Sequence, residues 1–280
     1  MHDLSYLYDI TSHLVATEKV PLLFLGHGNP MNAITDNQCV KAFRNIAKTL
    51  PKPAAIICIS AHWFTKGTKV TAMALPRTIH DFGGFPPELY RVQYPAKGNP
   101  ILADYVKQLI QAEQPLNHVE LDHKWGLDHG TWSVLTHLYP QADIPVIQVS
   151  IDATQPPQYH FELAQTLASL RYKGVLIIGS GNIIHNLRLL DFARIDEYHY
   201  GYDWAIEAQD TLNQYLLQGQ FQALLAYEKL SHAVRLAIPT PDHYLPLVYI
   251  LGLQQKGESL TLFNDILVGG SLSMTSVKIE

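Results

Sequence analysis

Short runs of consecutive apolar residues recur along this 280-residue chain, and several of them end at a glycine, a serine or a histidine. The clearest run, residues 55–59, is rich in β-branched side chains and shows no alternation with polar residues. Such a run is typical of a strand that is buried on both faces between layers of helices. By the same reasoning we predict further strands at residues 21–25, 68–74, 119–121, 144–151, 175–178, 260–263 and 274–279.

Segments with apolar residues at helical spacing lie between most of these runs. Asp36 is a suitable N-cap for a helix that reaches residue 50, and Asn99 precedes a proline that suits the first turn of a helix through residue 112. Further helices are predicted at residues 131–138 and 157–171, in two or three pieces between residues 202 and 236, and at residues 241–253.

Strands and helices alternate along most of the chain, without a linker or an internal repeat. This order predicts one three-layer α/β/α domain with a central, mostly parallel or mixed sheet. We expect the domain to span residues 21–280, with residues 1–20 as an N-terminal extension. That extension has no basic segment before an apolar core, so we do not expect it to be a signal peptide.

Composition narrows the range of partners. Hydrophobic residues make up 47% of the chain and charged residues 16%, which is typical of a globular protein with a full core. A net charge of -5 and the lack of a basic run argue against nucleic acid or an anionic membrane as a partner. The two cysteines, Cys39 and Cys58, show no CxxC spacing, which favours a reducing cytoplasm. The sequence gives no indication of the oligomeric state.

The histidines carry the most information about chemistry. His27, His62 and His185 each follow an apolar run and a small residue or a short polar turn. Ligands of open α/β sheets gather at the carboxyl ends of strands, so these three side chains are expected at one edge. Neutral imidazole is a common ligand of zinc and ferrous iron. His129 and His243 are further candidates, although the first is also compatible with a turn residue and the second with a solvent-facing residue at a helix start.

Residues 75–99 form a long segment rich in proline, glycine and aromatic residues, and loops of this length inside compact domains are often functional. We expect an ordered lid or pocket wall here that includes His80 and Phe82. The alternative for His80 is a hydrogen bond to Asp81, and the alternative for Phe82 and Trp63 is packing in the core. No HExxH, GxSxG or phosphate-loop motif occurs. By spacing alone, the chain is predicted to hold a mononuclear metal centre of unknown reaction.

Six motifs in a fixed order add a family resemblance. They are LGHGNPM at 25–31, SAHW at 60–63, HDFGGFP at 80–86, GLDHG at 126–130, GSGN at 179–182 followed by HNL at 185–187, and HYLPL at 243–247. Together they resemble the class III extradiol ring-cleavage dioxygenases, in particular the 4,5-DOPA dioxygenase branch. The resemblance extends from about residue 21 to the C-terminus.

The resemblance implies a three-layer α/β fold and one divalent metal ion per chain, Fe(II) for turnover, with Zn(II) often bound in purified members. It implies that His27 and His62 are metal ligands, that His185 is the third ligand and that His243 is a fourth or nearby ligand where the superfamily has a glutamate. His129 would be the acid–base residue. His80, Phe82 and Trp63 would contact the substrate.

The implied reaction is the opening of a catechol such as L-DOPA by O2 to a semialdehyde of the 4,5-seco-DOPA type. A nearby histidine would accept a phenolic proton and later return it. Two alternatives stay open from the residues themselves. One is a zinc-dependent hydrolase that uses the same histidines to activate water. The other is a non-catalytic binding module on the same scaffold.

Overall fold

The computed structural model of the chain describes residues 16–114 and 118–280. Most of the expected N-terminal extension, residues 1–15, lies outside the described residues. The last part of it does not stand apart from the domain. The backbone N–H groups of Thr17 and Val20 donate hydrogen bonds to the carbonyls of Tyr172 and Arg171, at 2.9 and 3.0 Å.

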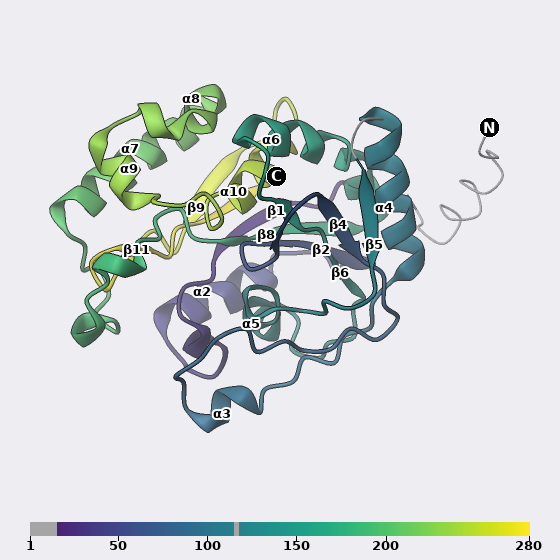
Figure 1. Ribbon diagram of the computed structural model, residues 1–280, viewed down its shortest axis with the longest axis horizontal. Helices are drawn as coiled ribbons and strands as arrows, with labels where there is room; N and C mark the ends of the chain where they lie inside the picture. The colour runs from purple at the N-terminus through teal and green to yellow at the C-terminus, as the bar shows by residue number, and fades with distance from the viewer. Residues whose placement is uncertain (1–15, 115–117) are drawn as a thin grey trace.

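A six-stranded mixed sheet forms the centre of the fold (Figure 1). Its four parallel strands lie side by side, and two antiparallel strands near the C-terminus extend one edge. The order across the sheet is β6 (Val146–Gln148), β2 (Ala55–Ser60), β8 (Val175–Gly181), β1 (Leu22–Gly26), β12 (Ser276–Ile279) and β9 (Leu260–Phe263). The predicted α/β class with a mostly parallel or mixed sheet is confirmed.

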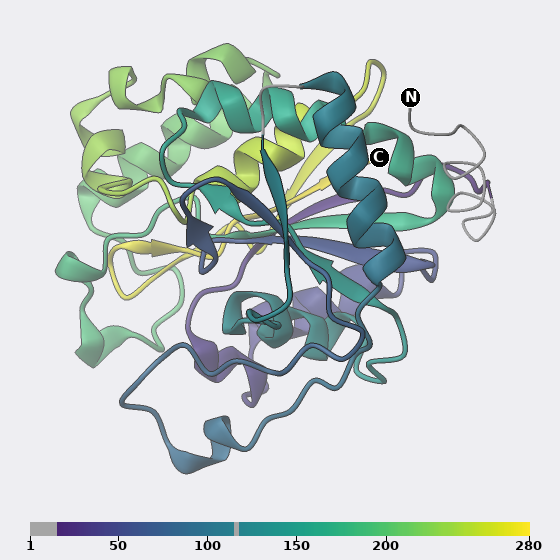
Figure 2. The ribbon, with the colours of Figure 1, turned by 45° about the vertical axis from the view of Figure 1, so that its right-hand side comes forward.

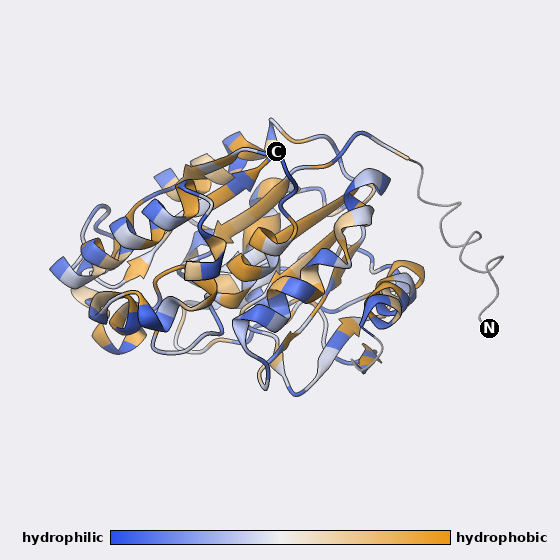
Figure 3. Ribbon diagram, turned by 90° about the horizontal axis from the view of Figure 1, so that it is seen from above, coloured by the Kyte–Doolittle hydropathy of each residue, from blue (hydrophilic) through white to orange (hydrophobic). Residues whose placement is uncertain are grey.

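Strand β2 shows why the apolar runs form this sheet. It lies between β6 and β8, with Ile57 opposite Ile147 on one side and Ile177 on the other, and all six of its residues are buried. β-Branched side chains pack well on such a pleated surface, where both faces are covered. In Figure 3 the central strands are coloured as apolar, whereas the helices around them carry both colours.

Helices cover both faces of the sheet, as the two ribbon views show (Figures 1 and 2). Helix α10 (Leu245–Gly252) lies against β8, β1 and β2 and packs on α6 (Pro157–Gln165). On the opposite face, α5 (His129–Leu138) contacts β2 and β8 and packs on α2 (Gln38–Ala47). The predicted three layers are therefore present.

The remaining elements extend this framework. They are α3 (Pro87–Tyr90), α4 (Pro100–Glu113), α7 (Asp203–Leu217), α8 (Phe221–Leu225), α9 (His232–Ala237), the short strands β10 (Leu267–Val268) and β11 (Leu272–Ser273), and the 3-10 turns η1 (Pro30–Ala33), η2 (Ala168–Lys173), η3 (Leu187–Leu189), η4 (Phe192–Arg194) and η5 (Tyr227–Lys229). None of the helices in the described ranges combines the length and the apolar character needed to cross a membrane.

Three of the predicted strands are present but differ from the prediction in detail. The strands predicted at 68–74 and 119–121 leave the central sheet, because β4 (Thr68–Thr71) and β5 (Val119–Asp122) pair with each other in a separate ladder. The strand predicted at 144–151 is divided between β6 and β7 (Ile151–Asp152), and β7 pairs with β3 (Phe64–Thr65). The division has a clear cause. Val149 donates its backbone N–H to Cys58 of β2, whereas Ser150 donates to Lys69 of β4.

Helix boundaries also differ from the prediction at three places. The N-cap of α2 is Asn37, whose side chain accepts the N–H of Val40 at 3.0 Å, and the predicted cap Asp36 instead pairs with Arg44. The segment 157–171 is divided between α6 and η2. The helix predicted from residue 241 begins at Leu245, so His243 lies in the turn before it. The predicted Asn99 cap of α4 is confirmed.

Candidate active site

Five histidines that are far apart in the sequence line one cavity of about 450 Å³. Three of them follow the carboxyl ends of neighbouring strands: His27 follows β1, His62 follows β2 and His185 follows β8. The other two come from helical layers on opposite sides of the sheet, His129 from α5 and His243 from the turn before α10. The structure thus brings together all five histidines that were predicted as metal ligands or as the acid–base residue.

Hydrogen bonds fix the protonation of His27. Its Nδ1 lies 3.0 Å from Oγ of Ser180, and this hydroxyl donates its only proton to the carbonyl of Gly130 at 2.5 Å. Nδ1 of His27 must therefore be the donor, which leaves the lone pair on Nε2. Burial, and then the neighbouring imidazoles, hold the pKa of His27 well below its ordinary value, so the ring is neutral.

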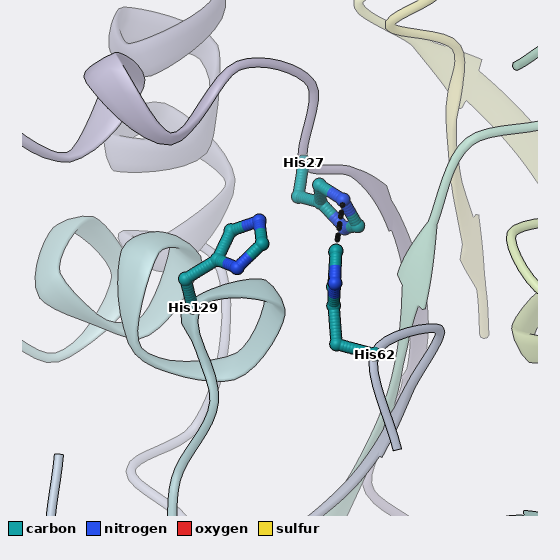
Figure 4. A group of neighbouring side chains, drawn as sticks. All are labelled: His27, His62 and His129. Atoms are coloured by element: carbon teal, nitrogen blue, oxygen red, sulfur yellow. Dashed lines mark hydrogen bonds between the residues drawn. The ribbon is translucent and has the colours of Figure 1, made fainter. Parts of the chain in front are cut away.

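A carboxylate also lies beside His62. Its Nδ1 lies 3.3 Å from Oδ2 of Asp81, and Nε2 faces Nε2 of His27 at 3.2 Å (Figure 4). If the carboxylate holds the proton on Nδ1, neither Nε2 atom carries one, and two lone pairs face each other. Two nitrogens bound at about 2.1 Å to one ion lie about 3.0–3.4 Å apart for angles between octahedral and tetrahedral. The pair of lone pairs therefore fits a shared cation.

Asp81 also contacts His129, the first residue of α5. Its Oδ1 accepts the backbone N–H of His129 at 2.9 Å and lies 3.0 Å from Nδ1 of the ring. The ring N–H does not point at this oxygen, so the contact with Nδ1 is electrostatic rather than a hydrogen bond. Burial tends to raise the pKa of Asp81, but the contacts with His129 lower it below its ordinary value. Asp81 is thus a carboxylate that touches two of the five histidines.

A second acidic residue holds the start of α5 against the sheet. Asp128 caps this helix, and its Oδ1 accepts hydrogen bonds from Oγ of Ser60 at 2.7 Å and from the backbone of Thr131 at 3.1 Å. Its Oδ2 accepts from the side chains of Gln148 at 2.6 Å and Trp125 at 3.2 Å. Burial, and then the neighbouring carboxylate of Asp81, raises the pKa of Asp128, whereas the hydrogen bonds from Gln148 and Ser60 favour its charged form. The network positions the helix that carries the acid–base candidate.

His243 and His185 form the opposite wall. Their rings stack with centroids 3.5 Å apart and planes within 5° of parallel. Asp242 accepts a hydrogen bond from Nδ1 of His243 at 2.5 Å, and in the neutral tautomer that makes this bond the lone pair is on Nε2. Burial tends to raise the pKa of Asp242, but this hydrogen bond holds it well below its ordinary value. Burial, and then His243, lowers the pKa of His185 to about 3.

The turn that carries His243 is held directly to the end of β8. The backbone N–H of Asn182 donates to the carbonyl of His243 at 2.9 Å. A side chain at Gly181 would collide with that carbonyl, so this close approach of two backbones requires glycine. The GSGN motif therefore has a packing role as well as a role in ending the strand.

Ring spacing distinguishes the five histidines. The centroids of His27, His62 and His243 form a nearly equilateral triangle with sides of 5.0, 5.3 and 5.0 Å. Imidazoles bound at about 2.1 Å to one ion place their centroids about 4.6–5.3 Å apart. The ring centroids of His129 and His62 are only 3.8 Å apart, and the ring of His185 is stacked parallel to that of His243. Neither pair therefore has the ring arrangement expected of two ligands that point at the same ion.

The distances between donor atoms distinguish the candidate ligands less clearly than the ring spacings do. The nitrogens of His27, His62 and His129 lie within 4.8 Å of one another, and so do the donor atoms of His185, Asp242 and His243. Both groups belong to the same cavity, and His243 is the member of the second group whose ring faces the first pair. The residues present fit a divalent ion held by neutral imidazoles, with histidines left over for proton transfer.

The three residues predicted to contact substrate have different positions. Phe82 lines the cavity and meets the ring of His129 edge to face, with centroids 5.4 Å apart. Neither His80 nor Trp63 is among the described residues that line it. Nε2 of His80 lies 3.0 Å from the carbonyl oxygen of Val92, within hydrogen-bond distance. Trp63 is only 3% exposed. The ring of Trp63 stacks on Trp125, so the structure gives both residues packing roles.

Sequence reasoning missed the residues that orient the histidines. Asp81, Asp242 and Ser180 contact His62, His243 and His27, respectively, and none was predicted as part of the site. Some signal was present, since Asp81 lies inside the HDFGGFP motif and Asp242 directly precedes a candidate ligand.

Comparison with known proteins gives consistent matches. The family model described as the catalytic LigB subunit of aromatic ring-opening dioxygenase matches residues 15–265. The 4,5-DOPA dioxygenase extradiol of Escherichia coli K12 is 44% identical over 269 residues, which cover 95% of this chain and 97% of that protein. The protein of the same name from Beta vulgaris is 36% identical and covers 91% and 94%, respectively. A crystal structure of an uncharacterized protein from Escherichia coli K12 superposes with a TM-score of 0.80 at 41% identity, covering 94% of this chain and all of that one.

Proposed function

Because this chain belongs to the family of catalytic LigB subunits of aromatic ring-opening dioxygenases, we propose that it opens a catechol ring with O2, giving a semialdehyde of the 4,5-seco-DOPA type from L-DOPA. The resemblance inferred from six sequence motifs is thereby confirmed, and the chain is an extradiol ring-cleaving enzyme. L-DOPA is the first substrate to test because two relatives carry it in their names.

The observation that carries the proposal is the triangle of His27, His62 and His243, whose ring centroids lie 5.0–5.3 Å apart, a spacing that suits three ligands of one divalent ion. We propose these three as ligands, so that His243 takes the place of third ligand that the family resemblance implied for His185. A set of neutral imidazoles suits both iron and zinc. When bound, ferrous iron would supply the redox chemistry that allows O2 to react with a catechol, and Zn(II) is the ion we expect in protein purified without added iron.

His129 is the residue best placed to move a proton. Its ring lines the cavity beside His62, with Nδ1 3.0 Å from a carboxylate oxygen of Asp81, and from this position it can accept a phenolic proton. The same ring can return the proton when the ring-opened product forms. His185 lines the opposite wall, where its ring nitrogens can hydrogen-bond the second hydroxyl of the diol. The two unliganded histidines would therefore bracket the substrate.

The aromatic loop contributes the remaining wall. Phe82 and Phe85 pack edge to face, with centroids 5.3 Å apart, and both line the cavity beside the glycines between them. Their rings reduce the access of water to the diol and orient the catechol ring by apolar contact. His80 lies behind this wall, 5.7 Å from the ring of Phe82.

The test is oxygen consumption by metal-reconstituted protein. Protein loaded with Fe(II) under anaerobic conditions is mixed with L-DOPA and then with air, while an oxygen electrode and a diode-array spectrometer follow the reaction. We expect one O2 per catechol and a yellow ring-opened product. The controls are protein loaded with Zn(II), the variant His27→Ala, and a catechol monomethyl ether, which cannot chelate.

Two results would contradict the proposal. The first is the absence of oxygen uptake from iron-loaded protein across a panel of catechols. The second is turnover that is supported equally by zinc and is independent of oxygen, which would favour the hydrolase alternative.

A further inference from the structure

The cavity has two chemically distinct halves. The histidines form its floor, whereas its outer half is lined by the apolar side chains of Phe82, Phe85, Leu187, Leu190, Phe192 and Ile195. Among the described residues that line it, none is a lysine, arginine, aspartate or glutamate. We use the term apolar wall for Leu187, Leu190, Phe192 and Ile195, which come from one segment after β8.

The volume exceeds what a catechol ring requires. A cavity of about 150 Å³ is enough to hold benzene, and this one measures about 450 Å³. Roughly two thirds of the space therefore lies beyond the ring, between the aromatic loop and the apolar wall. That space must receive the substituent of the substrate.

The apolar wall is unusually accessible to solvent. Phe192 is 74% exposed and Leu187 is 50% exposed, although both are large hydrophobic residues. Exposed apolar side chains that gather at one place generally mark a binding surface. Here the exposed side chains also line the active-site cavity, where the substituent of a bound catechol would come into contact with them.

Nearby cations do not change this character. The guanidinium of Arg194 makes two hydrogen bonds of 2.5 Å to the carboxylate of Glu197 and lies 3.3 Å above the ring of Tyr200. It is therefore already neutralised by a partner. Arg188 lies on the same segment but is exposed and outside the lining of the cavity.

We propose that this site selects catechols with an uncharged, apolar substituent over catechols with a charged side chain such as that of L-DOPA. This inference rests on the proposed ring-opening function. Each methylene buried against the apolar wall should raise kcat/KM by about fourfold, which is the usual gain from burial of such a group. A carboxylate in the same space loses water without gaining a partner, which opposes its binding.

The experiment compares substrates of matched shape on the iron-loaded protein. 4-(3-Methylbutyl)catechol has the same number and branching of substituent heavy atoms as 3-(3,4-dihydroxyphenyl)propanoate but no charge, and 4-methylcatechol and L-DOPA complete the set. We expect kcat/KM for the alkyl compound to exceed that for the propanoate and for L-DOPA by tenfold or more. Anaerobic calorimetric titration of the zinc-loaded protein should give the same order of Kd values without turnover.

A variant tests the wall itself. Phe192→Arg places a cation at an exposed position of the rim, and should raise kcat/KM for the propanoate relative to the alkyl compound by about tenfold. The matched control is Leu217→Arg, because Leu217 is 61% exposed on α7 and does not line the cavity. This control should leave the ratio unchanged.

Three results would overturn the inference. If L-DOPA or the propanoate is opened as well as the alkyl compound, or loses its activity specifically in Arg188→Ala, the site recognises charge. If Phe192→Arg alters the oligomeric state but not the substrate ratio, the wall is a contact between copies. If no catechol is opened, the proposed function has failed and the inference fails with it, a result that differs from turnover with the wrong preference.

Discussion

The substitution Asp81→Asn tests whether the carboxylate behind the histidines supports metal binding. Asparagine has nearly the same shape as aspartate but lacks the charge and has only one oxygen. In the structure, Oδ2 of Asp81 lies 3.3 Å from Nδ1 of His62 while Oδ1 accepts the backbone N–H of His129 at 2.9 Å. An amide can satisfy one of these contacts and must direct its NH2 group at the other. We therefore expect the ion to bind more weakly while the fold is retained.

The magnitude follows from the geometry. The path from Oδ2 of Asp81 through the imidazole of His62 to an ion at Nε2 is about 7.5 Å, counting about 2.1 Å for the metal–nitrogen bond. Coulomb's law gives about 1–4 kcal/mol for a unit charge and a divalent ion at this distance, for effective dielectric constants between about 80 and 20. A central value of about 2 kcal/mol corresponds to roughly a 30-fold loss of affinity, within the 10- to 100-fold range usual for partners of metal-bound histidines.

The assay is a competition titration of metal-free protein with Zn(II) and a chromogenic chelator, which gives the Kd directly. Thermal unfolding of the metal-free protein serves as a second readout, where we expect a loss of no more than about 1 kcal/mol from the start of α5. The matched control is Asp36→Asn, since Asp36 pairs with Arg44 at the surface. Unchanged zinc affinity in Asp81→Asn, or an equal loss in Asp36→Asn, would refute the reasoning.

Three further substitutions distinguish effects on metal or substrate binding from effects on the stability of the fold. Gly130→Ala, which helix propensity alone would favour, should weaken zinc binding at least tenfold in the same titration, because the new Cβ would lie 2.8 Å from the ring of His62. Glu258→Gln should lower the free energy of unfolding of metal-free protein at pH 7 by about 2–3 kcal/mol. Burial tends to raise the pKa of Glu258, but the contact with Arg171 lowers this pKa to about 2. The stability difference between the wild-type protein and Glu258→Gln should therefore shrink as the pH falls from about 4.5 to about 2, as measured by urea titrations. A constant deficit across that range would contradict this. Trp63→Phe should reduce thermal stability and leave KM for catechols unchanged, whereas a KM increase would place Trp63 in the substrate site.

The sheet and the position of the site could be predicted because both follow from short-range patterns. A short, uninterrupted apolar run such as residues 55–59 is typical of a buried strand and compatible with few other structures. In a parallel sheet, residues that follow such strands must share one edge, which is why His27, His62 and His185 meet. The identification of the family needed six motifs together, since each histidine alone has an ordinary structural explanation.

The finer features depend on relations that no local pattern encodes. The stacking of His185 on His243 places the former beside the triangle rather than in it, and this is decided by the contact of the turn before α10 with the end of β8. The proton positions on His27 and His62 depend on Ser180 and Asp81, which are distant in sequence.

Trp63 is a residue whose position the sequence suggested wrongly, again because the position depends on a contact with a residue distant in the sequence. It is adjacent to His62 in the chain, yet its ring stacks on Trp125 and it is not among the described residues that line the cavity. Sequence proximity to a candidate ligand therefore did not imply a place in the cavity.

The most direct test of the central claim is a crystal structure of iron-loaded protein with anomalous diffraction data collected at the iron edge. The structure predicts one anomalous peak per chain, within about 2.2 Å of the Nε2 atoms of His27, His62 and His243, with space on the side of His129 and His185 for a diol and O2. A peak bound to His185 and Asp242 without His27 and His62, or two peaks in the cavity, would contradict it.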